Sequence, residues 1–394
     1  MLKINKKIVS AFFAIFLSVL VSIPLIANAL VIYNDPNGDG DIELNDNVLI
    51  TQYLGGTVDV TNLERLDFDN NKIISKADAY EVQLYKLGLL NPGTINLPSS
   101  ETFGGSSYAY YHVFSASTGN QLTNKSYMLY NFSPVPNSIT DPEVPDTVIG
   151  SDSRVPNWDR TGVVKLMTSS YYAGSGFVVA PHIIATAAHC VYNYNNLSYE
   201  SGRVISGIKL FNNLGVNTLT ATPVECHVPY SYINSINSNP GQQTNEFDYA
   251  LITVEEDLSD YMCFDLGVAL NAASVNHVAI TNAGFPAEIN PDTPSAQTVN
   301  DHNIHNMYQG QGNLINSTAF SPDRQLFYDL DTSGGNSGGP VYVTQTVHDK
   351  YGNNTKVYYS VIAINVSGAT EFNIGTRMNG ELIRFYLHNN NPSW

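Results

Sequence analysis

Short apolar runs separated by turn-rich segments fill the second half of the chain, from Val148 onward. Runs of about four to eight residues between turn signals are typical of an all-β barrel or sandwich, not of alternating strands and helices. The final stretch, Gly380–His388, has helical character and is expected to close the fold. The expected strands are Gly162–Met167, Ser175–Ala180, Ile183–Ala188, Tyr249–Val254, Val278–Thr281, Val341–Thr344 and Val357–Asn365.

The first part of the chain has a different pattern, in which an acidic loop and an apolar-periodic stretch occur twice. The loops begin at Asp35 and at Asp67, 32 residues later. The stretches that follow them, Val48–Leu54 and Ala79–Leu87, have the spacing of helices. We therefore expect a small helical module at residues 30–90.

Each loop has oxygen ligands at positions 1, 3, 5 and 12 and an apolar residue at position 8. Calcium needs about six to eight hard oxygen ligands, which a 12-residue loop can supply. One such loop could be a chance acidic turn, but two in register argue against chance. At position 6 of the second loop stands Lys72, where the sharp turn prefers glycine. The expected ligands are Asp35, Asn37, Asp39, Asp41 and Asp46 in the first loop and Asp67, Asp69, Asn71, Ile73 and Asp78 in the second.

The two remaining segments have no globular pattern. Residues 1–29 predict a secretory signal peptide, with a basic start, an apolar run over Ile8–Ile26 and small residues at Ala27 and Ala29. An uncleaved anchor is the alternative, since that run approaches the roughly 20 residues that span a membrane. Residues 91–147 are rich in Ser, Thr, Asn, Pro and Gly and indicate a linker with a possible pro-segment. The protein is thus expected to be secreted and extracellular.

Composition narrows the function further. The 394 residues are 43% hydrophobic, enough for a sizeable core, and carry a formal net charge of −17. That charge repels phosphate backbones and excludes nucleic-acid binding. The three cysteines, Cys190, Cys226 and Cys263, lack metal-site spacing, and an odd number leaves at least one outside any disulfide within the chain. A disulfide near Cys190 is expected, with its partner left open.

Three blocks in the second half carry chemistry. His189 follows a predicted strand, Asp248 leads into another, and Ser337 lies in Gly334-Gly-Asn-Ser-Gly-Gly339. Clustered glycines let the backbone turn around one serine so that amide groups point beside its hydroxyl. Serine needs a base, so we expect Ser337 as nucleophile, His189 as general base and Asp248 as the carboxylate that orients it. Gly335 and Ser337 N–H groups would form the oxyanion hole, and no cofactor is required there.

With these blocks in this order, residues 148–394 resemble a chymotrypsin-like serine endopeptidase, and more narrowly the bacterial glutamyl endopeptidase family. The resemblance implies a double β-barrel with a C-terminal helix. It also implies that Thr332 and the residue at Asn365 read the substrate's P1 side chain. The family has histidine at the second position, and Asn365 cannot supply its charge. We therefore expect a weakened preference for P1 glutamate, or a shift to polar P1 residues.

Residues 30–90 resemble a type I dockerin, since position 12 is Asp and no helix precedes the first loop. This implies calcium-dependent docking onto a cohesin module of a cellulosome scaffoldin. In that family, loop positions 10 and 11 select the cohesin. These are Leu44 and Asn45 in the first repeat and Lys76 and Ala77 in the second, and the difference favours one preferred orientation.

Maturation and two alternatives remain open. In the resembling family a pro-segment is removed near the position of Val148, and such a cut would separate peptidase and docking module. Asn336 replaces the aspartate that pairs with a new amino terminus in trypsin-type zymogens, so that ion pair is not expected. One alternative is a catalytically inactive binding protein. The other is a dockerin-borne carbohydrate-active module, which would need paired carboxylates that no motif supports.

Overall fold

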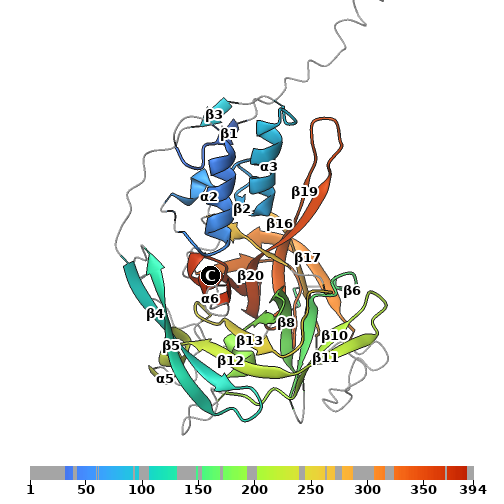
Figure 1. Cartoon of the computed structure of the whole chain (residues 1–394). Coiled ribbons are helices and arrows are strands. Elements are labelled where there is room, and N and C mark those ends of the chain that lie inside the picture. The colour runs from blue at the N-terminus through green and yellow to red at the C-terminus, as the bar shows by residue number, and fades with distance from the viewer. Residues whose placement is uncertain are drawn as a thin grey trace, which may run out of the picture.

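The computed structural model describes residues 32–387 apart from 39–41, 59, 61, 92–93, 97–105, 131–147, 150–152, 169–171, 193–201, 239–244, 262–263, 271–276, 287–305, 316–323 and 369–370. These ranges form a small helical module, two large β-sheets and two two-stranded pairings (Figure 1). None of their helices is long and apolar enough to cross a membrane. The expected signal peptide at 1–29 lies outside the described residues, as does most of 131–152.

The helical module contains both predicted helices, α2 (Leu44–Leu54) and α3 (Lys76–Lys86), joined through η1 (Leu63–Arg65) and β2 (Ile73–Ile74). The start of α3 follows from its sequence: the Ser75 hydroxyl accepts a hydrogen bond from Ala77 N, and Asp78 accepts one from Ser75 N. Beside the helices, β1 (Ile32–Asn34) pairs in parallel with β3 (Thr94–Asn96). Phe68 stacks on Tyr33 in the module's core, with ring centroids 4.7 Å apart.

The first sheet has nine strands in the order β11-β10-β7-β8-β9-β13-β12-β4-β5. Its short connections include α4 (Ala188–Val191), and α5 (Tyr230–Ser238) follows β12. Buried apolar residues alternate with turns as the sequence predicts, and four expected strands lie here as β7, β8, β9 and β13. The strands are β4 (Ser106–Ser115), β5 (Gln121–Tyr130), β7 (Val163–Met167), β8 (Tyr172–Ala180), β9 (Ile183–Thr186), β10 (Gly207–Phe211), β11 (Asn217–Ala221), β12 (Pro223–Pro229) and β13 (Ala250–Val254).

The second sheet closes on itself. Its order is β14-β20-β19-β16-β17-β18-β21, and the additional pairing of β20 with β21 completes a six-stranded barrel. The helix α6 (Gly380–Leu387) follows β21, as predicted for the C-terminal stretch. The strands are β14 (Asp265–Leu266), β16 (Ala279–Gly284), β17 (Tyr308–Ile315), β18 (Gln325–Tyr328), β19 (Pro340–Val347), β20 (Lys356–Gly368) and β21 (Asn373–Arg377), while β6 (Val155–Pro156) pairs with β17.

The predicted double barrel is therefore present in part, as one closed barrel and one open sheet. The open sheet continues into residues 91–147, where the sequence predicts a linker. There β4 and β5 form a hairpin, and β4 pairs with the free edge of β12. Tyr111, Val113 and Phe114 of this hairpin are buried in the main core. The Ser-, Thr- and Asn-rich composition of this stretch does not by itself indicate strands.

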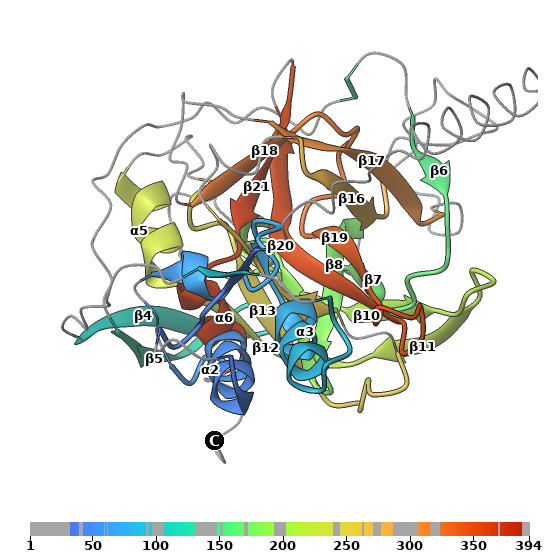
Figure 2. The same ribbon diagram turned by 90° about the horizontal axis from the view of Figure 1, so that it is seen from above.

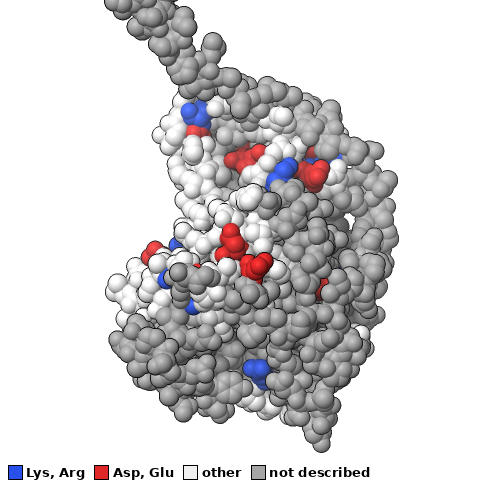
Figure 3. Space-filling model, turned by 180° about the vertical axis from the view of Figure 1, so that it is seen from behind, with Lys and Arg blue, Asp and Glu red and all other residues white. Residues whose placement is uncertain are grey.

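The helical module sits on the barrel rather than apart from it. Seen from above, α2 and α3 lie next to α6 and the β19–β20 hairpin (Figure 2). The small strand β15 (Val268–Ala269) of the peptidase region pairs with β2 of the module. Seen from behind, acidic side chains appear at several separate places, some at the level of the module and others below it (Figure 3).

Candidate active site

His189 and Asp248 are brought together by the pairing of two strands. His189 stands in α4, just after β9, and Asp248 stands just before β13, while Thr186 of β9 pairs with Ala250 of β13. His189 Nδ1 lies 2.6 Å from Asp248 Oδ2, and His189 N donates to Asp248 Oδ1 at 2.9 Å. The Asp248 side chain is fully buried. The carboxylate therefore fixes both the position and the tautomer of the imidazole.

Two opposing effects set the pKa of His189. Burial alone would lower it, but the Asp248 carboxylate and Cys190 raise it, and the net pKa lies well above its ordinary value. A charged partner at hydrogen-bond distance stabilises the imidazolium. The ring is thus prepared to take up a proton at Nε2.

The Ser337 loop is fixed against β8, β9 and α4. Gly338 has φ +84°, and a Cβ there would lie 2.1 Å from Ser175 O and 2.2 Å from Thr186 Oγ1, so only glycine fits. Ser337 O accepts hydrogen bonds from Ser175 N at 2.8 Å and from the Cys190 thiol at 3.5 Å. The nucleophile predicted from sequence thus lies against α4, which carries His189.

A further residue of this site, Ser175, has no signal in the sequence beyond its place in a strand. It is fully buried, and its hydroxyl donates to Gly335 O at 2.8 Å and accepts from Phe285 N at 2.9 Å. Gly335 has φ +100°, a backbone conformation that glycine adopts readily and other residues rarely do. Ser175 therefore fixes the backbone of the residue expected to supply an oxyanion N–H.

The two residues expected to read P1 are both buried. The Thr332 hydroxyl has no hydrogen-bond partner among the described residues, and Thr332 is fully buried. Asn365 is tied to the Ser337 loop, since Gly338 N donates to Asn365 O at 2.8 Å. Its side-chain oxygen accepts from Tyr328 OH at 2.6 Å, a contact that the sequence did not reveal. Tyr328 thus orients the Asn365 amide.

Next to Thr332, Asp331 anchors the start of the peptidase region. Its carboxylate accepts hydrogen bonds from Ile149 N and Ser153 N, both at 2.7 Å. The Ser153 hydroxyl adds a third at 2.6 Å. The segment near Val148 is therefore held beside the expected P1 pocket.

The expected disulfide near the active site is not formed by Cys190 or Cys226, since both are buried free thiols. Gly174 faces Cys190, and a Cβ at Gly174 would lie 2.5 Å from the thiol sulfur. Only glycine therefore lets β8 approach this free thiol so closely. Burial, and next the Glu225 charge, raise the pKa of Cys226 to about 12, which keeps that thiol unreactive. Cys263 lies outside the described residues.

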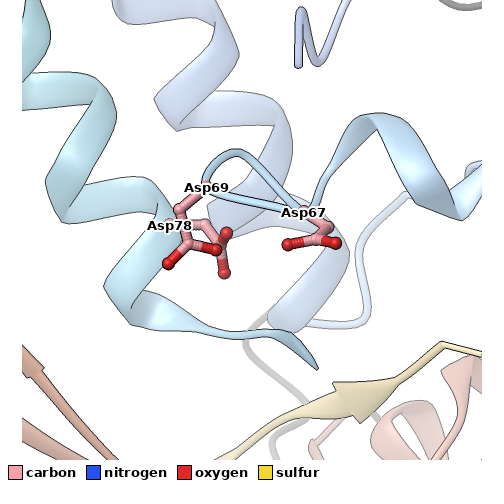
Figure 4. A group of neighbouring side chains, drawn as sticks. All are labelled: Asp67, Asp69 and Asp78. Carbon is pink, nitrogen blue, oxygen red and sulfur yellow. The ribbon is translucent and has the colours of Figure 1, made fainter. Parts of the chain in front are cut away.

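In the second loop, the structure brings together three of the expected calcium ligands. Ligand atoms of Asp67, Asp69 and Asp78 all lie within 4.8 Å of one another (Figure 4). Asp67 is fully buried, and its Oδ1 has no hydrogen-bond partner among the described residues. Lys72 has φ +75°, so the sharp turn forms without the glycine that position 6 prefers. Hard oxygens in this arrangement fit calcium.

Electrostatics in this loop point the same way. Burial, followed by the charge of Asp69, raises the pKa of Asp67 to about 7, and the pKa of Asp78 lies well above its ordinary value for the same reasons. A fourth carboxylate, Glu81, belongs to this group, because burial and then Asp69 and Asp67 raise its pKa to about 8. Four acidic groups without a cation thus oppose one another's ionisation.

The first loop is described in part. Asp35 accepts a hydrogen bond from Gly38 N at 2.7 Å, and Asp46 accepts from Asn37 N at 3.1 Å and from Glu43 N at 2.7 Å. The last bond matches the one from Ser75 N to Asp78 in the second loop. The other two expected ligands, Asp39 and Asp41, lie outside the described residues.

Comparisons with known proteins cover the part of the chain that holds this candidate site. A family model described as trypsin-like peptidase domain matches residues 174–346, a range that contains His189, Asp248 and Ser337. The chain therefore contains a trypsin-like peptidase domain. It is also distantly similar to glutamyl endopeptidase of Bacillus licheniformis, with 23% identity over 240 residues, which are 60% of this chain and 66% of that protein.

Other relatives are similarly distant. Extracellular metalloprotease of Bacillus subtilis (strain 168) is 23% identical over 255 residues, covering 60% of this chain and 68% of its own length. A solved structure of Glu endopeptidase in complex with MPD is 19% identical, with a TM-score of 0.45, and covers 60% of this chain and 96% of that one. Kallikrein-related peptidase 10 in complex with Zn²⁺ is 12% identical, with a TM-score of 0.38 over 60% of this chain and 100% of that one. TM-scores below 0.5 mark partial overlaps, so the peptidase class rests on the family model.

Proposed function

We propose that the protein is a secreted serine endopeptidase in which Ser337, His189 and Asp248 form the catalytic triad. The observation that carries this is the 2.6 Å contact between His189 Nδ1 and Asp248 Oδ2 beside the Ser337 loop. His189 Nε2 removes the Ser337 proton as the hydroxyl attacks a peptide carbonyl, and Asp248 stabilises the resulting imidazolium. The protonated His189 then donates to the leaving amine. Water, deprotonated by His189, releases the acyl group from Ser337.

The oxyanion of each tetrahedral intermediate is assigned to the N–H groups of Gly335 and Ser337. One such donor contributes on the order of 3 kcal/mol to the transition state. Glycines at 335 and 338 with positive φ support this assignment, since they give the loop the turn that directs amides inward. Fluorophosphonate labelling of Ser337 tests the proposal directly and distinguishes it from a catalytically inactive binding protein.

Ser175→Ala is expected to lower kcat more than it changes KM. The substitution leaves Gly335 O and Phe285 N without their buried partner, which costs about 1–3 kcal/mol of stability per group. Misplacing one oxyanion donor lowers kcat by about 10²-fold. Steady-state kinetics on a peptide substrate would measure both constants, with Ser206→Ala as a matched serine whose hydroxyl bonds Met167 O elsewhere. A lower melting temperature with unchanged kcat would reduce Ser175 to a structural role.

The P1 preference is proposed to be broader than glutamate. Thr332 and Asn365 offer hydroxyl and amide groups but no positive charge, and a buried carboxylate needs a charge or several donors. Cleavage-site profiling of a peptide library is expected to give polar P1 residues alongside glutamate. A profile restricted to glutamate would contradict this assignment. In that case, profiling of Tyr328→Phe would test whether the orientation of the Asn365 amide by Tyr328 is what maintains the glutamate preference.

For the N-terminal module we propose calcium binding in both loops and docking to a cohesin. The second repeat is a poor docking face, because Lys76 forms an ion pair with Asp265 at 2.6 Å and Ala77 is only 1% exposed. In the first repeat, Leu44 is 59% exposed and Asn45 is exposed as well. We therefore assign cohesin contact to the first repeat.

Substitution of the first-repeat pair is expected to abolish calcium-dependent cohesin binding. Leu44→Ala with Asn45→Ala removes the exposed contact, while Lys76→Ala leaves that face intact. Calorimetric titration of the full chain with a cohesin module measures the difference. If Lys76→Ala weakened binding as strongly as the double variant, the orientation would be the reverse one.

A further inference from the structure

The second loop is built into the interface between the helical module and the peptidase barrel. Its residues at positions 7 and 8, Ile73 and Ile74, form β2, which pairs antiparallel with β15. Leu270 N adds a hydrogen bond to Lys72 O at 2.9 Å. Ile73 is 2% exposed and packs in the barrel's apolar cluster with Ala269 and Ile362. The conformation of this loop and the surface of the barrel are therefore fixed together.

The peptidase side of this contact is tied to two barrel strands. Gly267 N donates to Val361 O of β20 at 2.9 Å, and the Arg377 guanidinium of β21 donates to Ala269 O. The neighbour of Arg377, Thr376, donates to the backbone oxygen of Asp248 at 3.1 Å. The loop is thus connected through β15 to Arg377 of β21, and the adjacent residue Thr376 contacts the backbone of Asp248.

Beside β2, helix α3 contacts the barrel through a buried apolar cluster, in which Ala77 and Leu84 pack with Val347 of β19. Tyr80 OH donates to Asn354 O at 2.9 Å, and Lys350 N donates to Leu89 O at 2.7 Å, both at the surface. The ion pair of Lys76 with Asp265 is mostly solvent-exposed on the lysine side, and such pairs contribute about 0–1 kcal/mol. The buried strand β2 is therefore one of two buried attachments in this region, and it is the one that belongs to the acidic loop itself.

That loop contains the converging carboxylates. Asp67 and Asp78 are fully buried and point at one another with Asp69 (Figure 4), and both Asp67 Oδ1 and Glu81 Oε2 are buried without a hydrogen-bond partner among the described residues. Buried like charges favour an opened loop unless a cation joins them. We infer that calcium bound in the second loop acts as a clasp that holds β2 on β15 and so fixes the helical module to the peptidase barrel.

This inference rests on the calcium binding proposed above and adds a consequence for maturation. If the chain were cut near Val148, the clasp and the β4–β12 pairing would keep the two parts together. Cleavage would then not release the peptidase from its scaffold while calcium is present. Calcium would then strengthen an attachment that the β4–β12 pairing also supports.

Hydrogen exchange of the full chain with Ser337→Ala, which prevents self-digestion, tests the clasp. With saturating calcium, exchange in residues 264–270 and in Ile73–Ile74 is expected to be about 100-fold slower than with EGTA. That is the factor by which a ligand at 100 times its Kd depopulates the opened state. Strand β7, far from the loop, is the internal reference and should not change.

Variants assign the effect to the second loop. Asp78→Asn should remove the calcium dependence at 264–270, and Asp69→Asn serves if that variant does not fold. The matched control is Glu64→Gln, which removes one exposed charge of the same module outside the cluster and should keep the full dependence. Calorimetric calcium binding with unchanged exchange at 264–270 would overturn the clasp alone. Absence of calcium binding would overturn both the clasp and the calcium assignment, and labelling of Ser337 in the wild-type chain reports on the peptidase independently.

Discussion

Ser337→Ala is expected to abolish fluorophosphonate labelling and to lower kcat by a factor on the order of 10⁶. The reason is chemical: Ser337 is the proposed nucleophile, and its loop is held beside α4, where Cys190, the residue after His189, contacts Ser337 O. Removing the nucleophile leaves only substrate binding and the oxyanion donors, which retain a small residual rate. Active-site titration and peptide hydrolysis measure the two effects.

The matched control is Ser259→Ala, which removes an exposed hydroxyl that bonds only Asp257 in its own turn. It should label and cleave as the wild type does. Undiminished labelling of the Ser337→Ala variant would show that another nucleophile reacts and would reject the proposed triad. If neither protein were labelled while both are folded, the inactive binding protein would be the better description.

Local sequence was enough to locate much of this site because each piece is formed by adjacent residues. The Ser337 loop requires glycines whatever surrounds it, and the structure gives Gly335 and Gly338 positive φ. The calcium loops are likewise local, and three of the five ligands expected in the second loop converge. At Lys72, where glycine is preferred, the backbone adopts the turn at φ +75° despite the side chain.

What the sequence could not show are contacts made between distant segments. Ser175 and Gly335 are 160 residues apart, and Tyr328 meets Asn365 only because their strands share a barrel. The hairpin β4–β5 has no strong period of its own, and it joins the sheet through the distant edge of β12. The pairing of β2 with β15 could not be predicted from the sequence for the same reason. Two apolar residues at loop positions 7 and 8 could pack within the module or pair with a strand elsewhere in the chain.

Asp248→Asn is expected to lower kcat by about 10⁴-fold while leaving the fold intact. In the wild type, Asp248 accepts hydrogen bonds from His189 N at 2.9 Å and from His189 Nδ1 at 2.6 Å. Asparagine has nearly the same shape, and its carbonyl oxygen can still accept one of these two bonds. It cannot stabilise an imidazolium, and its NH₂ group favours the wrong tautomer of the ring. Asp159→Asn, an exposed aspartate, is the matched control and should keep wild-type kcat.

The pH dependence of kcat/KM separates this electrostatic role from simple misplacement. In the wild type the pKa of His189 lies above its ordinary 6.5, because Asp248 and Cys190 outweigh burial. His189 must be neutral to accept the serine proton, so kcat/KM should fall as the pH drops, with a midpoint above 6.5. In Asp248→Asn the carboxylate is gone and burial remains, so the midpoint should move downward even though the rate is low. A midpoint that did not move would show that Asp248 positions the ring without raising the pKa of His189. The proposed stabilisation of the imidazolium would then be wrong.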